Sequence, residues 1–152
     1  MSIDDEYELL SRLELFEHLE PVQLKRLIFV SQRYQLQPDE YLFRQGDPMD
    51  GVFGIVKGEF SVILESTNGQ IVAALQGPGD LVGEMAVISG EPRSASIRAN
   101  SMCEVIGFEK ELFIQTVISD PPTALKMMKL LSERLSNQNN LLAELSGGKY
   151  MI

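Results

Sequence analysis

Clusters of turn-forming residues divide the middle of the chain into short apolar segments, and this punctuation restricts the possible folds. From Tyr34 onward apolar and polar residues alternate, and turn signals recur every eight to twelve positions. Such spacing is typical of a sandwich or barrel of antiparallel strands. The strongest hairpin signal is Asn68-Gly69, because both residues tolerate a positive φ angle. The turn clusters are Gln37-Pro38-Asp39, Gln45-Gly46-Asp47-Pro48, Lys57-Gly58, Thr67-Asn68-Gly69 and Gln76-Gly77-Pro78-Gly79.

Helical patterns flank this region on both sides. Apolar residues recur at helix spacing from Leu9 to Gln32, with a break at Pro21. After one closing strand, the pattern predicts a short helix from about Lys110 to Ile118 and a long helix from about Pro122 to Leu145. The sequence therefore predicts an α+β chain whose antiparallel strands lie between two helical segments.

Composition and charge restrict the domain count and the partners. A chain of 152 residues with 44% hydrophobic composition fits one globular domain, 1–152. Its 13 basic and 22 acidic residues give a net charge of −9, which argues against direct binding to nucleic acid or to an anionic membrane. A single cysteine, Cys103, fits a reducing compartment. With no signal peptide pattern and no membrane-length apolar run, we expect a cytoplasmic protein.

The stretch from Gly77 to Ala99 concentrates the groups suited to binding a ligand. A glycine-rich turn precedes a short helical run, Glu84 to Ile88, and Arg93 and Ser94 follow. A helix start exposes N–H groups that favour anions. A carboxylate accepts hydrogen bonds from sugar hydroxyls, and a guanidinium binds two phosphate oxygens at once. Together these groups predict a site for a small anionic sugar phosphate.

This stretch resembles the phosphate-binding cassette of the cyclic nucleotide-binding domain family. The family pattern is Gly-Glu-x-(Ala/Leu), followed by Pro-Arg-(Ser/Thr/Ala)-Ala. In this chain the pattern stands as Gly83-Glu84-Met85-Ala86 and Pro92-Arg93-Ser94-Ala95. Residue types and spacing match together, so the signal is far more specific than a lone glycine motif.

The resemblance implies roles for individual residues. Glu84 is expected to bind the ribose 2′-hydroxyl. Arg93, Ser94 and nearby backbone N–H groups are expected to hold the cyclic phosphate. In the alternative interpretation, Glu84 and Arg93 only form an ion pair in a fold that has lost its ligand. The cassette residues expected to bind ligand are Gly83, Glu84, Met85, Ala86, Arg93, Ser94 and Ala95.

The resemblance extends over roughly residues 13–145 and implies a complete fold. That fold is an antiparallel β-roll, similar to a double-stranded jelly roll, with N-terminal helices and a long C-terminal helix. We expect helices over 1–32, the roll over 33–109 with its cassette at 83–95, and helices over 110–146. Two positions depart from the family: Pro38-Asp39 stands where a glycine is common, and Val82 where an aromatic residue often precedes the cassette.

The last helix carries a heptad pattern of apolar residues with one polar interruption. Such a stripe can simply lie on the helix's own roll. A second set of apolar residues (Leu125, Met127, Leu130 and Leu141) could cover the roll instead, and this favours a parallel two-helix homodimer. The stripe that would face the partner consists of Ala124, Met128, Leu131, Leu135, Gln138, Leu142 and Leu145.

The long helix resembles that of the bacterial catabolite-activator branch of the family, in which polar residues of this helix reach the nucleotide base. The matching positions are Gln138 and Asn139. An amide can donate to and accept from adenine, so cAMP is the expected ligand. Ser94 leaves cGMP open, because a hydroxyl after the arginine can also favour guanine. Alternatively, Gln138 only sets the register of the two helices.

These patterns predict a cyclic-nucleotide-binding regulatory module that signals through its last helix and a protein partner. The alternative is a dimeric interaction scaffold with a vestigial pocket. A metal-dependent jelly-roll enzyme is disfavoured because the chain has one histidine, too few for such a centre. Direct DNA binding is not expected, because the chain ends at Ile152, too soon after Leu145 for a helix-turn-helix domain.

Overall fold

The computed structural model describes residues 2–145, and within this range the side chains of residues 134 and 137–145 lie outside the description. Three N-terminal elements open the chain: α1 (Ile3–Leu10), the 3₁₀ turn η1 (Glu14–Phe16) and α2 (Pro21–Phe29). The break predicted at Pro21 is the start of α2, because proline fits the first helical position. The first strand begins at Gln32, one residue before the predicted start of the roll at residue 33.

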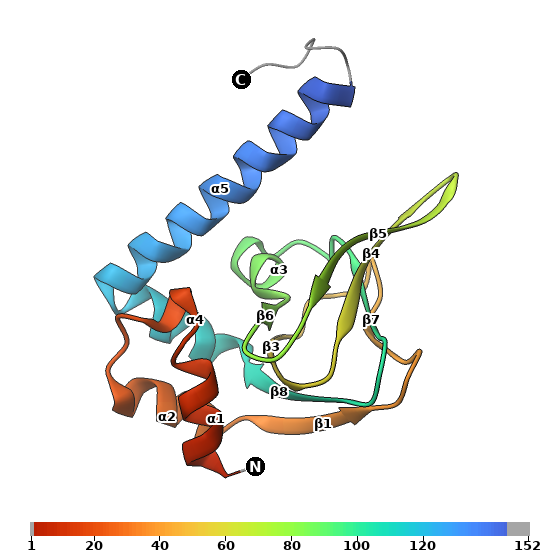
Figure 1. Ribbon diagram of the computed structural model, residues 1–152. Coiled ribbons are helices and arrows are strands. Elements are labelled where there is room, and N and C mark those ends of the chain that lie inside the picture. Colours follow the sequence, from red (N-terminus) through yellow and green to blue (C-terminus); the bar gives the residue numbers. More distant parts are fainter. Residues whose placement is uncertain (1, 146–152) are drawn as a thin grey trace.

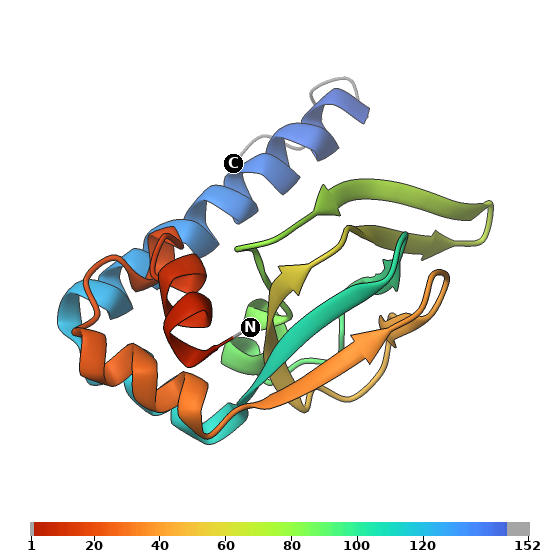
Figure 2. The same cartoon turned by 60° about the horizontal axis from the view of Figure 1, so that its bottom comes forward.

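The described residues form two four-stranded antiparallel sheets, as expected for a β-roll (Figures 1 and 2). The strand orders are β1-β8-β3-β6 and β2-β7-β4-β5. The predicted α+β fold, a roll between N-terminal helices and a long C-terminal helix, is confirmed. The strands are β1 (Gln32–Leu36), β2 (Tyr41–Phe43), β3 (Gly51–Lys57), β4 (Phe60–Ser66), β5 (Gly69–Gln76), β6 (Leu81–Val82), β7 (Ser96–Ala99) and β8 (Cys103–Glu109).

The turns agree with the prediction except for the position of one hairpin loop. The β4–β5 hairpin forms, but its two-residue loop is Thr67-Asn68, and Gly69 with φ 109° already belongs to β5. The predicted turn was therefore placed one residue too late. Asp39, which replaces a common family glycine, adopts φ 71°. Aspartate tolerates this left-handed conformation better than most residues, so the turn keeps a glycine-like backbone.

Two clusters of buried apolar residues stabilise the fold. One lies between the two sheets and includes Phe60 and Ile97. The other joins the helices to the β1-β8-β3-β6 sheet, where the Phe16 ring meets Phe108 and Phe113 edge-on, with centroids 6.3 and 6.4 Å apart. The second cluster holds the N-terminal helices against the C-terminal helices, so both helical segments are positioned by the same sheet.

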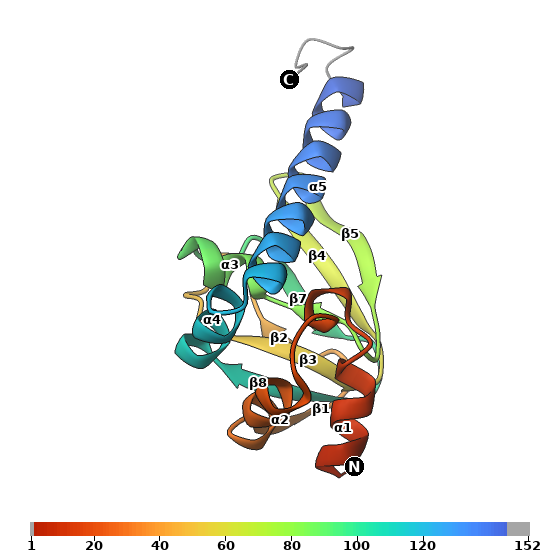
Figure 3. The same ribbon diagram turned by 90° about the vertical axis from the view of Figure 1, so that its left-hand side faces the viewer.

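Two helices end the described chain: α4 (Lys110–Ile118) and α5 (Pro121–Leu145). Asp120 caps α5, because its Oδ2 accepts a hydrogen bond from the Thr123 N–H at 3.2 Å. Figures 1 and 3 show that α5 begins beside α4 and extends past the sheets as one long helix.

The division of apolar faces on α5 differs in part from the prediction. Met127 is buried, and Met128 and Leu135 are exposed, as the two-stripe pattern predicts. Leu125 was expected to face the roll but is half exposed, whereas Leu131 of the other stripe packs against the helical core. The first turns of α5 therefore pack a different face against the helical core cluster than the heptad pattern predicts.

Candidate functional site

A cavity of about 310 Å³ lies between the cassette and the inner face of the β2-β7-β4-β5 sheet. The structure brings all seven cassette residues expected to bind ligand to its wall. The strands supply the remaining wall, which is mostly apolar. The lining residues are Phe43, Val62, Ala74, Gln76, Leu81, Val82, Gly83, Glu84, Met85, Ala86, Arg93, Ser94, Ala95 and Ile97.

The short helix α3 (Glu84–Ser89) forms one side of this cavity, and glycines define both of its ends. Gly83 at the N-cap and Gly90 at the C-cap have φ angles of 84° and 77°. A Cβ atom on Gly83 would lie 2.5 Å from Nη1 of Arg93, while one on Gly90 would meet nothing within 4 Å. Gly83 is therefore required both for its backbone angle and for the close approach of the arginine.

The Arg93 side chain is buried, with only 2% of its surface exposed. Its Nη1 donates to the Gly83 carbonyl at 3.1 Å, and its Nη2 donates to the Gly51 carbonyl at 2.7 Å. Nη2 also donates to Oδ1 of Asp50 at 2.9 Å. The loop backbone is fixed as well, since the Arg93 N–H donates to the Asp47 carbonyl at 2.9 Å. The guanidinium is thus held in one place before any ligand binds.

Aromatic rings complete the surroundings of Arg93. The guanidinium carbon lies 4.1 Å from the centroid of the Phe43 ring and 6.0 Å from that of Phe53. Stacking on a ring face stabilises a cation and limits its rotation. Among the described residues, Nε of Arg93 is buried and has no hydrogen-bond partner. A buried charged donor without a partner is costly, so this atom favours an added acceptor.

Glu84 and Ser94 differ in burial. Glu84 is 8% exposed and lines both this cavity and an adjoining one of about 520 Å³, which Arg12 and Leu130 also line. Ser94 is exposed at the cavity wall. The side chains of Gln138 and Asn139, the predicted base-reading residues, lie outside the described part of the chain.

The structure adds residues that the sequence did not single out. Phe43 stacks on Arg93, and Asp50 and the Gly51 carbonyl bind its guanidinium. Asp50 stands 43 positions before Arg93, so only the folded sheets bring them together. Phe43 lies opposite Ile97 on the strand that follows the cassette, and this pairing, too, exists only in the folded sheet.

Two features are absent from the described residues. No helix among them has the length and apolar character needed to cross a bilayer. No group of three or more His, Cys, Asp or Glu side chains gathers there in a way that suits a metal ion.

Comparison with known proteins finds relatives whose stated activities differ. It is 27% identical over 143 residues to lysophospholipase nte1 of Aspergillus oryzae, covering 93% of this chain and 9% of that protein. It is 24% identical over 144 residues to the CRP-like cAMP-activated global transcriptional regulator of Mycobacterium tuberculosis, covering 91% and 62%. The catabolite activator protein of Thermus thermophilus superposes with a TM-score of 0.78 at 27% identity, covering 88% and 63%. This chain spans less than two thirds of each of these proteins.

A family profile covers more than half of the chain. The profile of the cyclic nucleotide-binding domain matches residues 33–120, which include the whole cassette and every strand but the first residue of β1. The fold is that of the catabolite activator protein over most of the chain. The chain therefore belongs to the cyclic nucleotide-binding domain family and has the regulatory fold of that family.

Proposed function

We propose that this protein is a regulatory module, and not an enzyme, that binds cAMP in the cavity beside α3. The observation that carries the proposal is Arg93, a fixed and buried guanidinium on the cavity wall with one donor lacking a partner. A cyclic phosphate supplies the anionic acceptor that such a group favours. Arg93 and Ser94 hold the phosphate, together with the backbone of Gly83, Met85, Ala86 and Ala95.

Glu84 binds the ribose in this proposal. Its carboxylate lines the same cavity as Arg93, and a carboxylate accepts hydrogen bonds from sugar hydroxyls. The cavity volume of about 310 Å³ lies at the lower end of the range for small-molecule sites. The apolar wall from Val62, Leu81 and Ile97 suits the faces of the sugar and the base.

The preference for cAMP over cGMP rests on the last helix and on one relative. Gln138 and Asn139 lie on α5 and carry amides that can bind an adenine edge. The name of the M. tuberculosis relative also states activation by cAMP. Ser94 is the feature that would favour guanine instead, so the two nucleotides must be compared directly.

Signalling is proposed to pass through α5, a homodimer and a protein partner in the cytoplasm. Met128 and Leu135 are exposed apolar residues on α5 that a second copy of the helix can cover. A ligand shifts such an arrangement only by binding one state more tightly than the other. The net charge of −9 argues against direct contact with DNA or an anionic membrane. In this proposal residues 1–152 form one domain.

One observation favours the scaffold alternative. Asp50 and two backbone carbonyls already accept hydrogen bonds from both terminal nitrogens of Arg93. A vestigial pocket would keep the arginine for that internal role alone. In that case the Arg93 contacts stabilise the roll and the cavity binds no nucleotide.

Equilibrium dialysis with labelled cAMP distinguishes these functions. Arg93→Ala should weaken binding about 30-fold or more, because a charged hydrogen bond contributes about 2 kcal/mol. Arg44→Ala is the matched control, since Arg44 is an exposed arginine stacked 3.8 Å over the Tyr41 ring and does not line the cavity. Arg93→Lys is a second variant, for the case in which Arg93→Ala fails to fold. It keeps the positive charge but lacks the planar guanidinium, so it should also bind cAMP more weakly than wild type. Equal binding by folded wild type and Arg93→Ala would exclude the proposed site.

A further inference from the structure

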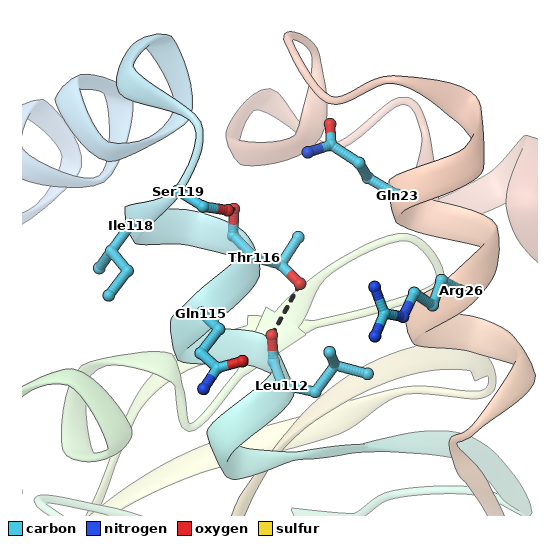
Figure 4. A pocket seen from close by; sticks show the side chains of 7 residues that line it. All are labelled: Gln23, Arg26, Leu112, Gln115, Thr116, Ile118 and Ser119. Carbon is cyan, nitrogen blue, oxygen red and sulfur yellow. Dashed lines mark hydrogen bonds between the residues drawn. The ribbon is translucent and has the colours of Figure 1, made fainter.

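A second cleft, of about 320 Å³, lies between α2 and α4 and shares no lining residue with the cassette cavity. Figure 4 shows Gln23 and Arg26 pointing from α2 toward α4, and Leu112 and Thr116 pointing from α4 toward α2. The Thr116 hydroxyl donates to the Leu112 carbonyl at 2.7 Å, so its one hydrogen-bond donor is already used. The lining residues are Gln23, Arg26, Leu112, Gln115, Thr116, Ile118 and Ser119.

Arg26 is the one charged residue in the lining of this cleft. It is exposed and forms no ion pair with any of the described residues, in a chain that has 22 acidic and 13 basic side chains. Two carboxylates on adjacent chain segments already have partners. Asp120 accepts from Thr123, and Glu111 lies 3.9 Å from the ammonium group of Lys110. The cleft thus presents an unneutralised guanidinium in otherwise uncharged walls.

Large apolar side chains lie exposed on the two helices beside the cleft. Val22 and Phe29 of α2 are 73% and 72% exposed, and Ile118 of α4 is 63% exposed. Val22, Arg26 and Phe29 are four and three residues apart, so they form one stripe along the outer face of α2. Lys25 is also three and four residues from Val22 and Phe29, but its ammonium group lies 3.8 Å from Oδ1 of Asp4, so Arg26 is the cation of this face without an ion pair among the described residues.

We propose that this cleft docks a short amphipathic segment of another protein, with an Asp or Glu placed between apolar residues. The carboxylate binds the Arg26 guanidinium, which can accept it in a bidentate manner. The flanking apolar side chains cover Val22, Phe29 and Leu112, as in the binding of a helix in a groove. Charge complementarity selects this occupant, because a basic segment would meet an unpaired cation. The proposal does not depend on nucleotide binding.

Selection of short peptides from a displayed random library against the full chain tests this proposal. Enriched peptides should carry an acidic residue flanked by apolar residues. Arg26→Glu should weaken their binding at least about tenfold, as expected when one partner of a close charge pair is reversed. Lys57→Glu is the matched control, since Lys57 is exposed at the end of β3 and makes the same charge change away from the cleft.

Phe29→Ser tests the apolar part separately, and its exposure of 72% means that folding should not change. It should also weaken the selected peptides, with an unchanged thermal unfolding midpoint. The proposal is overturned if nothing is enriched, if enriched peptides are basic, or if they bind Arg26→Glu as tightly as Lys57→Glu. Unchanged binding to Phe29→Ser overturns the apolar contact in the same way.

Discussion

Arg93 donates from Nη2 to Oδ1 of Asp50 at 2.9 Å, a contact that joins a side chain 1% exposed to one that is 80% exposed. The partners therefore respond differently to a competing anion. Asp50 can turn into water at little energetic cost. Arg93 remains held by the Gly83 and Gly51 carbonyls and by the Phe43 ring. In the proposed function, the exposed Asp50 carboxylate partly neutralises the Arg93 guanidinium that binds the phosphate.

Asp50→Asn should raise the affinity for cAMP a few-fold, because it removes the neutralising charge while the other contacts keep Arg93 oriented. Calorimetric titration of both proteins at low and moderate salt measures the effect. Asp47→Asn is a suitable control, since Asp47 is an exposed acid in the same loop whose Oδ2 accepts from the Arg44 N–H. A clear loss of affinity in Asp50→Asn would mean that Asp50 orients Arg93 and does not compete.

Gly83→Ala and Gly90→Ala separate backbone strain from the position of Arg93. Both glycines have positive φ, so each alanine should lower the free energy of unfolding by about 1 kcal/mol. Only the Gly83 variant places a Cβ atom 2.5 Å from Nη1 of Arg93. Denaturant unfolding should show the larger loss for Gly83→Ala, because the contact with Arg93 adds to the backbone strain, and nucleotide binding should fail in that variant alone. Equal binding by the two variants would contradict the required close approach.

Much of the local structure follows from the sequence, whereas the long-range contacts do not. Pro21, Pro121 and the apolar spacing place the start of α2 and both ends of α4 and α5 within about a residue, because caps and prolines act over a few bonds. The predicted end of the first helical segment, Gln32, is wrong by three residues, because α2 ends at Phe29 and β1 already begins at Gln32. The spacing of the cassette motif also locates α3 and Arg93 correctly on one cavity wall.

The remaining features depend on packing between distant segments. The Arg93–Asp50 contact crosses 43 positions and exists only once β3 lies beside the cassette. The heptad pattern of α5 does not say which face meets the body, and so the environments of Leu125 and Leu131 were predicted wrongly. The contacts of α5 with η1 and α4 decide which of its faces is buried.

Leu135→Asp should convert the proposed dimer to a monomer without unfolding it. Leu135 is 59% exposed in the single chain, so the new charge affects only a partner helix. Ser136→Asp is the control, because Ser136 is exposed beside Leu135 but lies off the heptad stripe. Sedimentation velocity should show a smaller species for Leu135→Asp alone. An unchanged dimer in that variant would exclude this stripe as the interface.

Lys126 should give stability a dependence on alkaline pH. Its ammonium group lies 2.7 Å from Oε1 of Glu14 and 3.4 Å from Oε1 of Glu17, which ties α5 to η1. The hydrogen bond with Glu14 raises the pKa of Lys126 above its ordinary value of 10.5. A raised folded pKa means that the contribution to stability is complete below the unfolded pKa and is lost as pH rises through the folded value.

Lys126→Met should therefore be less stable than wild type near neutral pH, and the gap should close above about pH 10.5. Denaturant unfolding across this range measures the gap, so that other alkaline titrations common to both proteins cancel. Lys129→Met, at an exposed lysine on the same helix, should show no such closing gap. A gap for Lys126→Met that stays constant with pH would mean that the charge of Lys126 contributes nothing.

The most direct test of the proposed function is calorimetric titration of ligand-stripped protein with cAMP and, separately, with cGMP. Stripping is needed because purified protein can carry nucleotide from its host. The account predicts binding of cAMP at micromolar affinity or tighter, about −8 kcal/mol or better, and weaker binding of cGMP. The absence of heat with either nucleotide, from a folded and stripped sample, would contradict the account and leave the interaction scaffold as the function.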